Sequence, residues 1–196
     1  MDLAGNIVKR SFFKVLIILL LADIVFLYGC AVNKYYKKPD YNIALVKKVA
    51  VLPFENFASD KYAGEKIREK VVIELLASGF EVVEEGEVMM QLTQLKVQSA
   101  SLLTLDEIKS LGQSLDVDAV IRGSVSTLGI IKGASVEYPE AALTLRMIEA
   151  ENGDTVWSVS NTAGGPGFLT RHFGIEGKTL DEVAREVVKE SIDTLK

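Results

Sequence analysis

The chain has 196 residues and a formal net charge of −5, with 27 Asp and Glu against 22 Lys and Arg. A nucleic-acid-binding protein presents a basic face, so this balance argues against a nucleic-acid partner. The single cysteine excludes an internal disulfide, so the fold has to be stabilised by a hydrophobic core, and a chain of this length can bury one.

The first thirty residues have the pattern of an export signal. Three basic residues precede an apolar run, Val15 to Leu27, and the segment ends with Gly29 and Cys30. A basic head, an apolar body and a small residue at the end are typical of a secretory signal peptide. A cysteine directly after the small residue resembles the lipobox of bacterial lipoproteins. That resemblance implies that residues 1–29 are removed and that acyl chains on Cys30 hold the protein on a membrane.

An uncleaved transmembrane helix is the alternative for this segment. Residues 15–32 are apolar except for Asp23, and about 18 such residues can span a bilayer. An acid in the middle of a span costs roughly 2.5–3.5 kcal/mol, although an acid is also unusual inside a signal peptide. Ala31 rather than an aspartate follows the cysteine, so general lipoprotein sorting implies the outer membrane, with the domain in the periplasm.

Residues 30–46 are predicted to be a short lipidated tether. Lysines are mixed with tyrosines over Lys34–Tyr41, a composition that suits a lipid headgroup layer. A solvated linker whose tyrosines pack on the domain is the other interpretation. A flexible coil of this length spans about 20–25 Å on average, so we expect the domain to lie close to its membrane.

The domain itself is predicted to open with a strand, a helix and a second strand. Lys47–Phe54 holds a short apolar run that is typical of a buried strand. The apolar residues of the following helix recur every four positions, at Ile67, Val71 and Leu75. Gly79 is placed to end that helix, and Phe80–Glu84 reads as the second strand.

Two helices and a strand are predicted next. Glu87–Lys96 has a helical apolar pattern. Thr104 and Glu107 have the spacing of a capping box, which predicts a helix over Leu105–Leu115. The apolar residues return to strand character over Val117–Leu128.

The last third of the chain is predicted to be antiparallel. Ala142–Ala150 and Thr155–Ala163 flank an Asn-Gly turn at residues 151–154, which is a strong hairpin signal. A final amphipathic helix is expected over Leu180–Leu195. The fold class is therefore α/β, as a single domain over residues 47–196 with a mixed β-sheet and helices packed on it.

Three segments resemble the curli production assembly/transport lipoproteins, the CsgG-like superfamily: Val49–Phe57, Ser78–Glu84 and Val117–Val125. The penicillin-binding-protein activator lipoproteins and the TolB amino-terminal domain share this general architecture. The channel subunits of the superfamily carry long amphipathic hairpins, each of which needs roughly 20–24 residues to span a bilayer. The candidate insertion points, residues 127–138 and 163–178, are shorter than that, so we predict a short member without the pore hairpins.

No catalytic, cofactor or metal site is expected. His172 is the only histidine, and the chain has no Gly-x-Ser-x-Gly motif. Gly164–Gly167 lacks the Gly-Lys-Ser/Thr ending of a phosphate loop. A run of glutamates is most simply a solvated edge, with a docking site for a basic partner as the alternative: Glu81, Glu84, Glu85 and Glu87.

The glycine-rich segment Gly164–Gly177 carries three large apolar residues: Phe168, Leu169 and Phe173. Apolar side chains on a loop often mark a partner surface, so these three are the candidate protein-binding residues. The alternative is that they fold back on the core as a lid.

These features predict a non-enzymatic envelope lipoprotein that acts as a scaffold, an adaptor or a homo-oligomeric assembly component. Its partners are expected to be the membrane, through Cys30, and another protein or another copy of itself. The alternative function, implied by the resemblance to penicillin-binding-protein activators, is to activate a peptidoglycan-synthesising enzyme.

Overall fold

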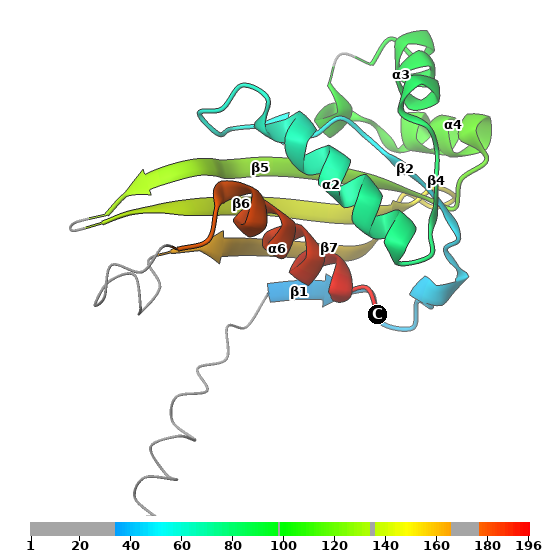
Figure 1. The fold of residues 1–196 in the computed structure, drawn as a ribbon. Coiled ribbons are helices and arrows are strands. Elements are labelled where there is room, and N and C mark those ends of the chain that lie inside the picture. The colour runs from blue at the N-terminus through cyan, green and yellow to red at the C-terminus, as the bar shows by residue number, and fades with distance from the viewer. Residues whose placement is uncertain (1–33, 98, 134–135, 166–176) are drawn as a thin grey trace, which may run out of the picture. The chain divides into compact units, whose positions relative to one another are not determined.

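The structure, a computed structural model, describes residues 34–97, 99–133, 136–165 and 177–196, which belong to one unit, Asn33–Lys196. Figure 1 shows a sheet with helices on it. The strands are β1 (Lys34–Lys37), β2 (Lys48–Val51), β3 (Glu55–Asn56), β4 (Glu81–Val82), β5 (Ala119–Lys132), β6 (Glu137–Glu149) and β7 (Thr155–Gly164). The helices are α2 (Ala63–Ala77), α3 (Glu85–Gln94), α4 (Leu105–Leu115) and α6 (Leu180–Asp193).

The sheet is mixed, which confirms the predicted fold class. The strand order is β1-β7-β6-β5-β2-β4, and β3 pairs with β5 farther along that strand. Strand β2 is parallel to both β4 and β5. Parallel neighbours need crossover connections, and helices supply them here. Strands β5, β6, β7 and β1 are antiparallel, with the predicted Asn-Gly turn between β6 and β7. Gly153 in that turn has φ +74°.

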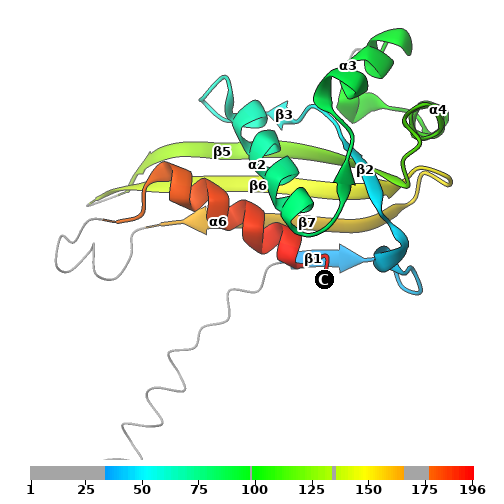
Figure 2. The same cartoon turned by 45° about the vertical axis from the view of Figure 1, so that its right-hand side comes forward.

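Helices cover both faces of the parallel part of the sheet (Figures 1 and 2). Val49 and Val51 of β2 face the core under α2 and α6, whereas Ala50 and Leu52 face a second core under α3 and α4. A strand buried on both faces needs apolar residues at every position, which explains the continuous run in the sequence.

Local sequence signals set the start of α4 and the end of α2 as predicted. The Thr104 hydroxyl accepts a hydrogen bond from the Glu107 amide, and the Glu107 carboxylate accepts one from the Thr104 amide in return. Thr179 and Glu182 form the same capping box at the start of α6. Gly79 follows α2 with φ +91°, the left-handed conformation that closes a helix.

The first strand lies inside the segment that the sequence predicts to be a tether. Lys34–Lys37 pairs antiparallel with β7, and the Lys38 amide donates to the Val156 carbonyl at 2.9 Å. Lys38 also forms an ion pair with Asp154 at 2.6 Å. The domain therefore begins at β1 and not at residue 47, because β1 supplies partners for the edge of β7.

The hairpin between β5 and β6 is longer than predicted. Its register continues from Leu128 opposite Ala141 to Lys132 opposite Glu137, so residues 127–138 are mostly paired strand and not a connecting loop. No helix within the described residues has the length and apolar character needed to cross a bilayer.

Candidate protein-interaction surface

The predicted site residues lie outside the described part of the chain. This holds for Cys30 and for the candidate protein-binding residues, Phe168, Leu169 and Phe173, and also for His172. The described residues just before position 166 do have a defined place. The Gly165 amide donates to the Pro139 carbonyl at 3.2 Å, so Gly165, the last described residue before position 166, lies beside the far end of the β5–β6 hairpin.

The glutamates of residues 81–87 make local contacts around the start of α3. The Glu84 carboxylate accepts a hydrogen bond from the Gly86 amide at 2.7 Å and caps the helix. Glu85 forms an ion pair with the buried Arg68 of α2, and Glu81 lies 3.9 Å from Lys48. Acidic residues in the first turn also interact favourably with the helix dipole. Glu81, Glu84 and Glu85 thus each have a partner within the domain.

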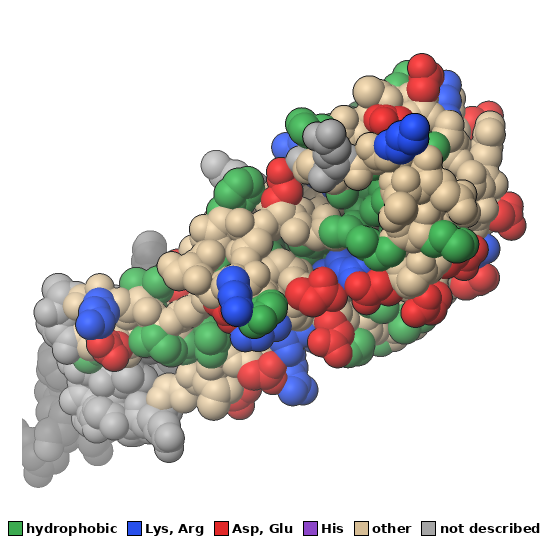
Figure 3. Space-filling view, turned by 90° about the horizontal axis from the view of Figure 1, so that it is seen from above, with side chains coloured by type: hydrophobic (Ala, Val, Ile, Leu, Met, Phe, Trp, Pro, Cys, Tyr) green, Lys and Arg blue, Asp and Glu red, His purple; other side chains and the backbone are tan. Residues whose placement is uncertain are grey.

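The far part of the hairpin carries apolar side chains on both faces. We call this part the distal hairpin, residues 127–132 and 137–142. Ile130 is opposite Pro139 on the helix-facing side, where its side chain is 55% exposed, and Ile131 is opposite Tyr138 on the other side. Figure 3 shows hydrophobic side chains at this end of the molecule, next to charges of both signs. An exposed apolar surface of this kind is typical of an interaction site.

The distal hairpin also presents an open strand edge. Strand β2 pairs with Ala119–Ile121 and β3 with Ser124–Val125, and the register shifts between Val125 and Thr127. Beyond that bulge, no described strand pairs with β5 on the side away from β6. The backbone groups on that side are available to another strand, so the edge can accept a partner by strand addition.

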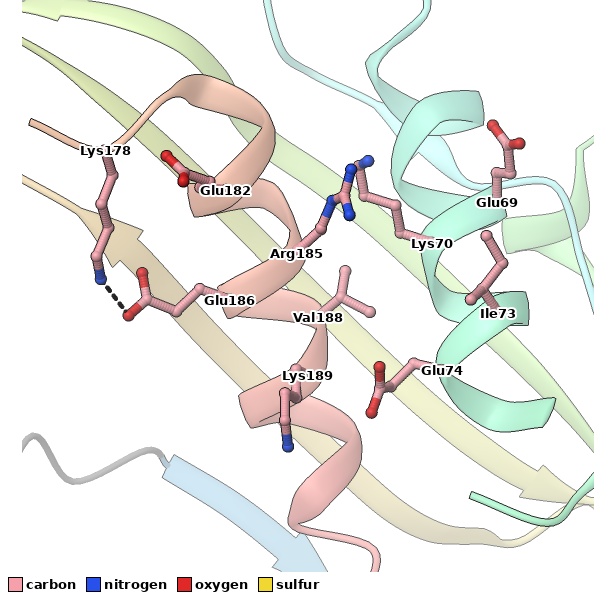
Figure 4. Close-up of a pocket in the computed structure, with 10 residues that line it drawn as sticks. All are labelled: Glu69, Lys70, Ile73, Glu74, Lys178, Glu182, Arg185, Glu186, Val188 and Lys189. Atoms are coloured by element: carbon pink, nitrogen blue, oxygen red, sulfur yellow. Dashed lines mark hydrogen bonds and ion pairs between the residues drawn. The ribbon is translucent and has the colours of Figure 1, made fainter. Parts of the chain in front are cut away.

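A second candidate surface is a groove between α2 and α6, with a volume of about 830 Å³. Figure 4 shows four acidic and four basic side chains around Ile73 and Val188. Several of its basic groups have carboxylate partners: Lys70 and Arg185 both contact Asp181, and Lys178 contacts Glu186. The groove is thus electrically balanced.

No three His, Cys, Asp or Glu side chains among the described residues are grouped closely enough to hold a metal ion.

No family model matches the chain, and no curated protein matches it. Several solved structures do match it. PelC from Paraburkholderia phytofirmans, solved as a dodecamer, has a TM-score of 0.58 at 19% identity over 85% of this chain and 99% of its own. Lipoprotein GNA1162 from Neisseria meningitidis has a TM-score of 0.54 at 19% identity, over 75% and 99%.

The chain has a bacterial lipoprotein-like fold. The hypothetical protein CT253 from Chlamydia trachomatis shares it with a TM-score of 0.51 at 11% identity, over 76% of this chain and 95% of its own. At these identities the likeness concerns the fold alone, so membership of the curli superfamily stays a prediction from the sequence.

Proposed function

We propose that the chain is a non-enzymatic lipoprotein of the cell envelope that assembles with copies of itself into a scaffold. Acyl chains on Cys30 would hold it on the outer membrane, with the domain in the periplasm. The export pattern of the first thirty residues and the fold shared with the GNA1162 lipoprotein support this proposal.

The observation that carries the proposal is the open edge of β5 in the distal hairpin. A strand edge with apolar side chains on both faces gains backbone hydrogen bonds and apolar burial when a second strand is added. In PelC the same fold builds a twelve-membered assembly. Repeated contact between one surface and a different one on the next copy gives a ring when the rotation between copies closes, and an open filament when it does not.

Native mass spectrometry of the full chain in a neutral detergent tests the proposal. The wild type should give a defined multiple of the mass of one chain. Ile130→Lys places a charge at the proposed contact, and burying it unpaired should weaken assembly by roughly a hundredfold. Ile73→Lys in the α2–α6 groove is the matched control, because Ile73 is 58% exposed and Ile130 is 55% exposed.

Loss of the oligomer with Ile73→Lys but not with Ile130→Lys would move the interface to the groove. A monomeric wild type at micromolar concentration would contradict self-assembly. A monomer that captures a purified peptidoglycan synthase would favour the activator function.

A further inference from the structure

Two arginines face each other across β5 and β6. Arg122 is directly opposite Arg146 in the register, on the face of the sheet away from α2 and α6. Directly opposed residues have Cβ atoms roughly 4.5–5.5 Å apart, and like-charged side chains in such a pair are destabilising. Burial lowers the pKa of the Arg122 guanidinium, and the neighbouring charge of Arg146 lowers it further.

These arginines line a small polar pocket of about 210 Å³. Ser124 and Thr144, the next opposed pair on the same face, bring two hydroxyl groups into it. Its remaining lining is Pro53, Glu55, Ala100 and Gly123. Glu55 is the one carboxylate among these lining residues, so the pocket carries two positive charges and one negative charge.

Arg146 differs from the other basic side chains described above in its ion-pair partners. Lys70, Lys178 and Arg185 each have a carboxylate partner, whereas no described carboxylate forms an ion pair with Arg146. The pocket thus carries a net positive charge on a chain whose formal net charge is −5.

We propose that this pocket binds a singly charged oxyanion, either a phosphodiester or a carboxylate. Guanidinium groups bind such oxygens through paired charge-assisted hydrogen bonds, and the Ser124 and Thr144 hydroxyls can donate to the same group. One negative charge balances the net charge of the pocket and relieves the repulsion between Arg122 and Arg146. The source is an anionic lipid headgroup or a soluble small molecule, and both present the same chemistry to the pocket.

The first experiment titrates the full chain in neutral detergent with dimethyl phosphate or acetate at constant ionic strength. The wild type should show a saturable rise in melting temperature and shifts of the Gly123 and Ser124 amide resonances. Arg146→Gln should weaken the apparent affinity at least about tenfold, because it removes charge-assisted hydrogen bonds. Arg185→Gln, another exposed arginine, should leave the affinity unchanged.

A second readout separates binding from a purely structural role. Without the anion, Arg146→Gln should melt at or above the wild-type temperature, since it removes a repulsion. The proposal is overturned if neither anion gives a saturable response, if Arg146→Gln responds as the wild type does, or if Arg146→Gln melts well below the wild type.

Vesicles distinguish the two sources. The full chain is reconstituted in phosphatidylcholine alone or with added phosphatidylglycerol, and hydrogen exchange of residues 122–126 and 142–146 is compared. Added protection with phosphatidylglycerol that Arg146→Gln abolishes identifies the headgroup as the source. Equal exchange in both lipids, together with a response to the soluble anions, identifies a small molecule.

Discussion

Tyr41 shows how a single side chain ties the beginning of the domain to the β6–β7 hairpin. Burial and the Glu149 carboxylate, which accepts its hydrogen bond, raise the pKa of Tyr41 to about 12. A raised pKa means that the folded state favours the neutral phenol. The stability that this provides is fully present below the unfolded-state pKa, about 10, and is lost as the pH rises through the folded value.

We therefore predict a difference between the wild type and Tyr41→Phe in alkaline solution. Their difference in free energy of unfolding should be constant below about pH 10 and should change between about pH 10 and 12, with the wild type losing more stability. Urea denaturation at a series of pH values measures it. Glu149→Gln should narrow this pH range, because the Glu149 carboxylate contributes to the raised pKa of Tyr41. Parallel curves for the wild type and Tyr41→Phe up to pH 12 would contradict the assignment.

At the scale of elements, β1 is the part of the fold with the weakest sequence signal. The Lys38 amide donates to Val156, and hydrogen-bonded positions alternate along an antiparallel pair. The Tyr36 amide therefore points toward β7 and the Tyr35 amide points away from it.

Proline substitutions test that geometry. Tyr36→Pro should lower the free energy of unfolding by about 1 kcal/mol more than Tyr35→Pro, because only the first removes a hydrogen bond to β7. Both tyrosines are about half exposed, so the side-chain losses are similar. Thermal melting gives the stabilities, and hydrogen exchange of residues 157–160 localises the effect. Equal and negligible effects would show that residues 34–37 are a tether after all.

How far the sequence predicts an element depends on how local its causes are. The capped helix Leu105–Leu115 has the predicted bounds, because Thr104 and Glu107 contact each other within one turn. Strand β1 was not predicted, since four residues rich in Lys and Tyr become a strand only against β7. The distal hairpin was missed because Gly129 and Pro139 weaken the alternating pattern within it.

The candidate sites depend on contacts between residues that are far apart in the sequence. The pairing of Arg122 with Arg146 depends on the register of β5 against β6, and nothing in either local sequence specifies it. The open edge of β5 depends on β3 ending at Asn56. Phe168, Leu169 and Phe173 remain a prediction, because they lie outside the described residues.

For the whole molecule, the membrane anchor is the central prediction. Cys30→Ser should abolish incorporation of radiolabelled palmitate and shift the protein out of the acylated pool. The melting temperature of the domain should stay the same, because Cys30 precedes the unit that contains the sheet. Ala31→Ser is the matched control and should still be labelled. Equal labelling of the wild type and Cys30→Ser would contradict the lipobox.

The pairing of β1 with β7 changes the mechanics of the proposed anchor. Only residues 31–33 separate Cys30 from the first strand. A fully extended tether of this length spans about 14 Å between Cys30 and Lys34. An acylated domain on so short a tether would stay close to the bilayer, and its copies would meet by diffusion in the plane of the bilayer. Such confinement raises the effective concentration of each copy for the next. For a given amount of protein, the assembled fraction should therefore be higher on a bilayer than in detergent solution.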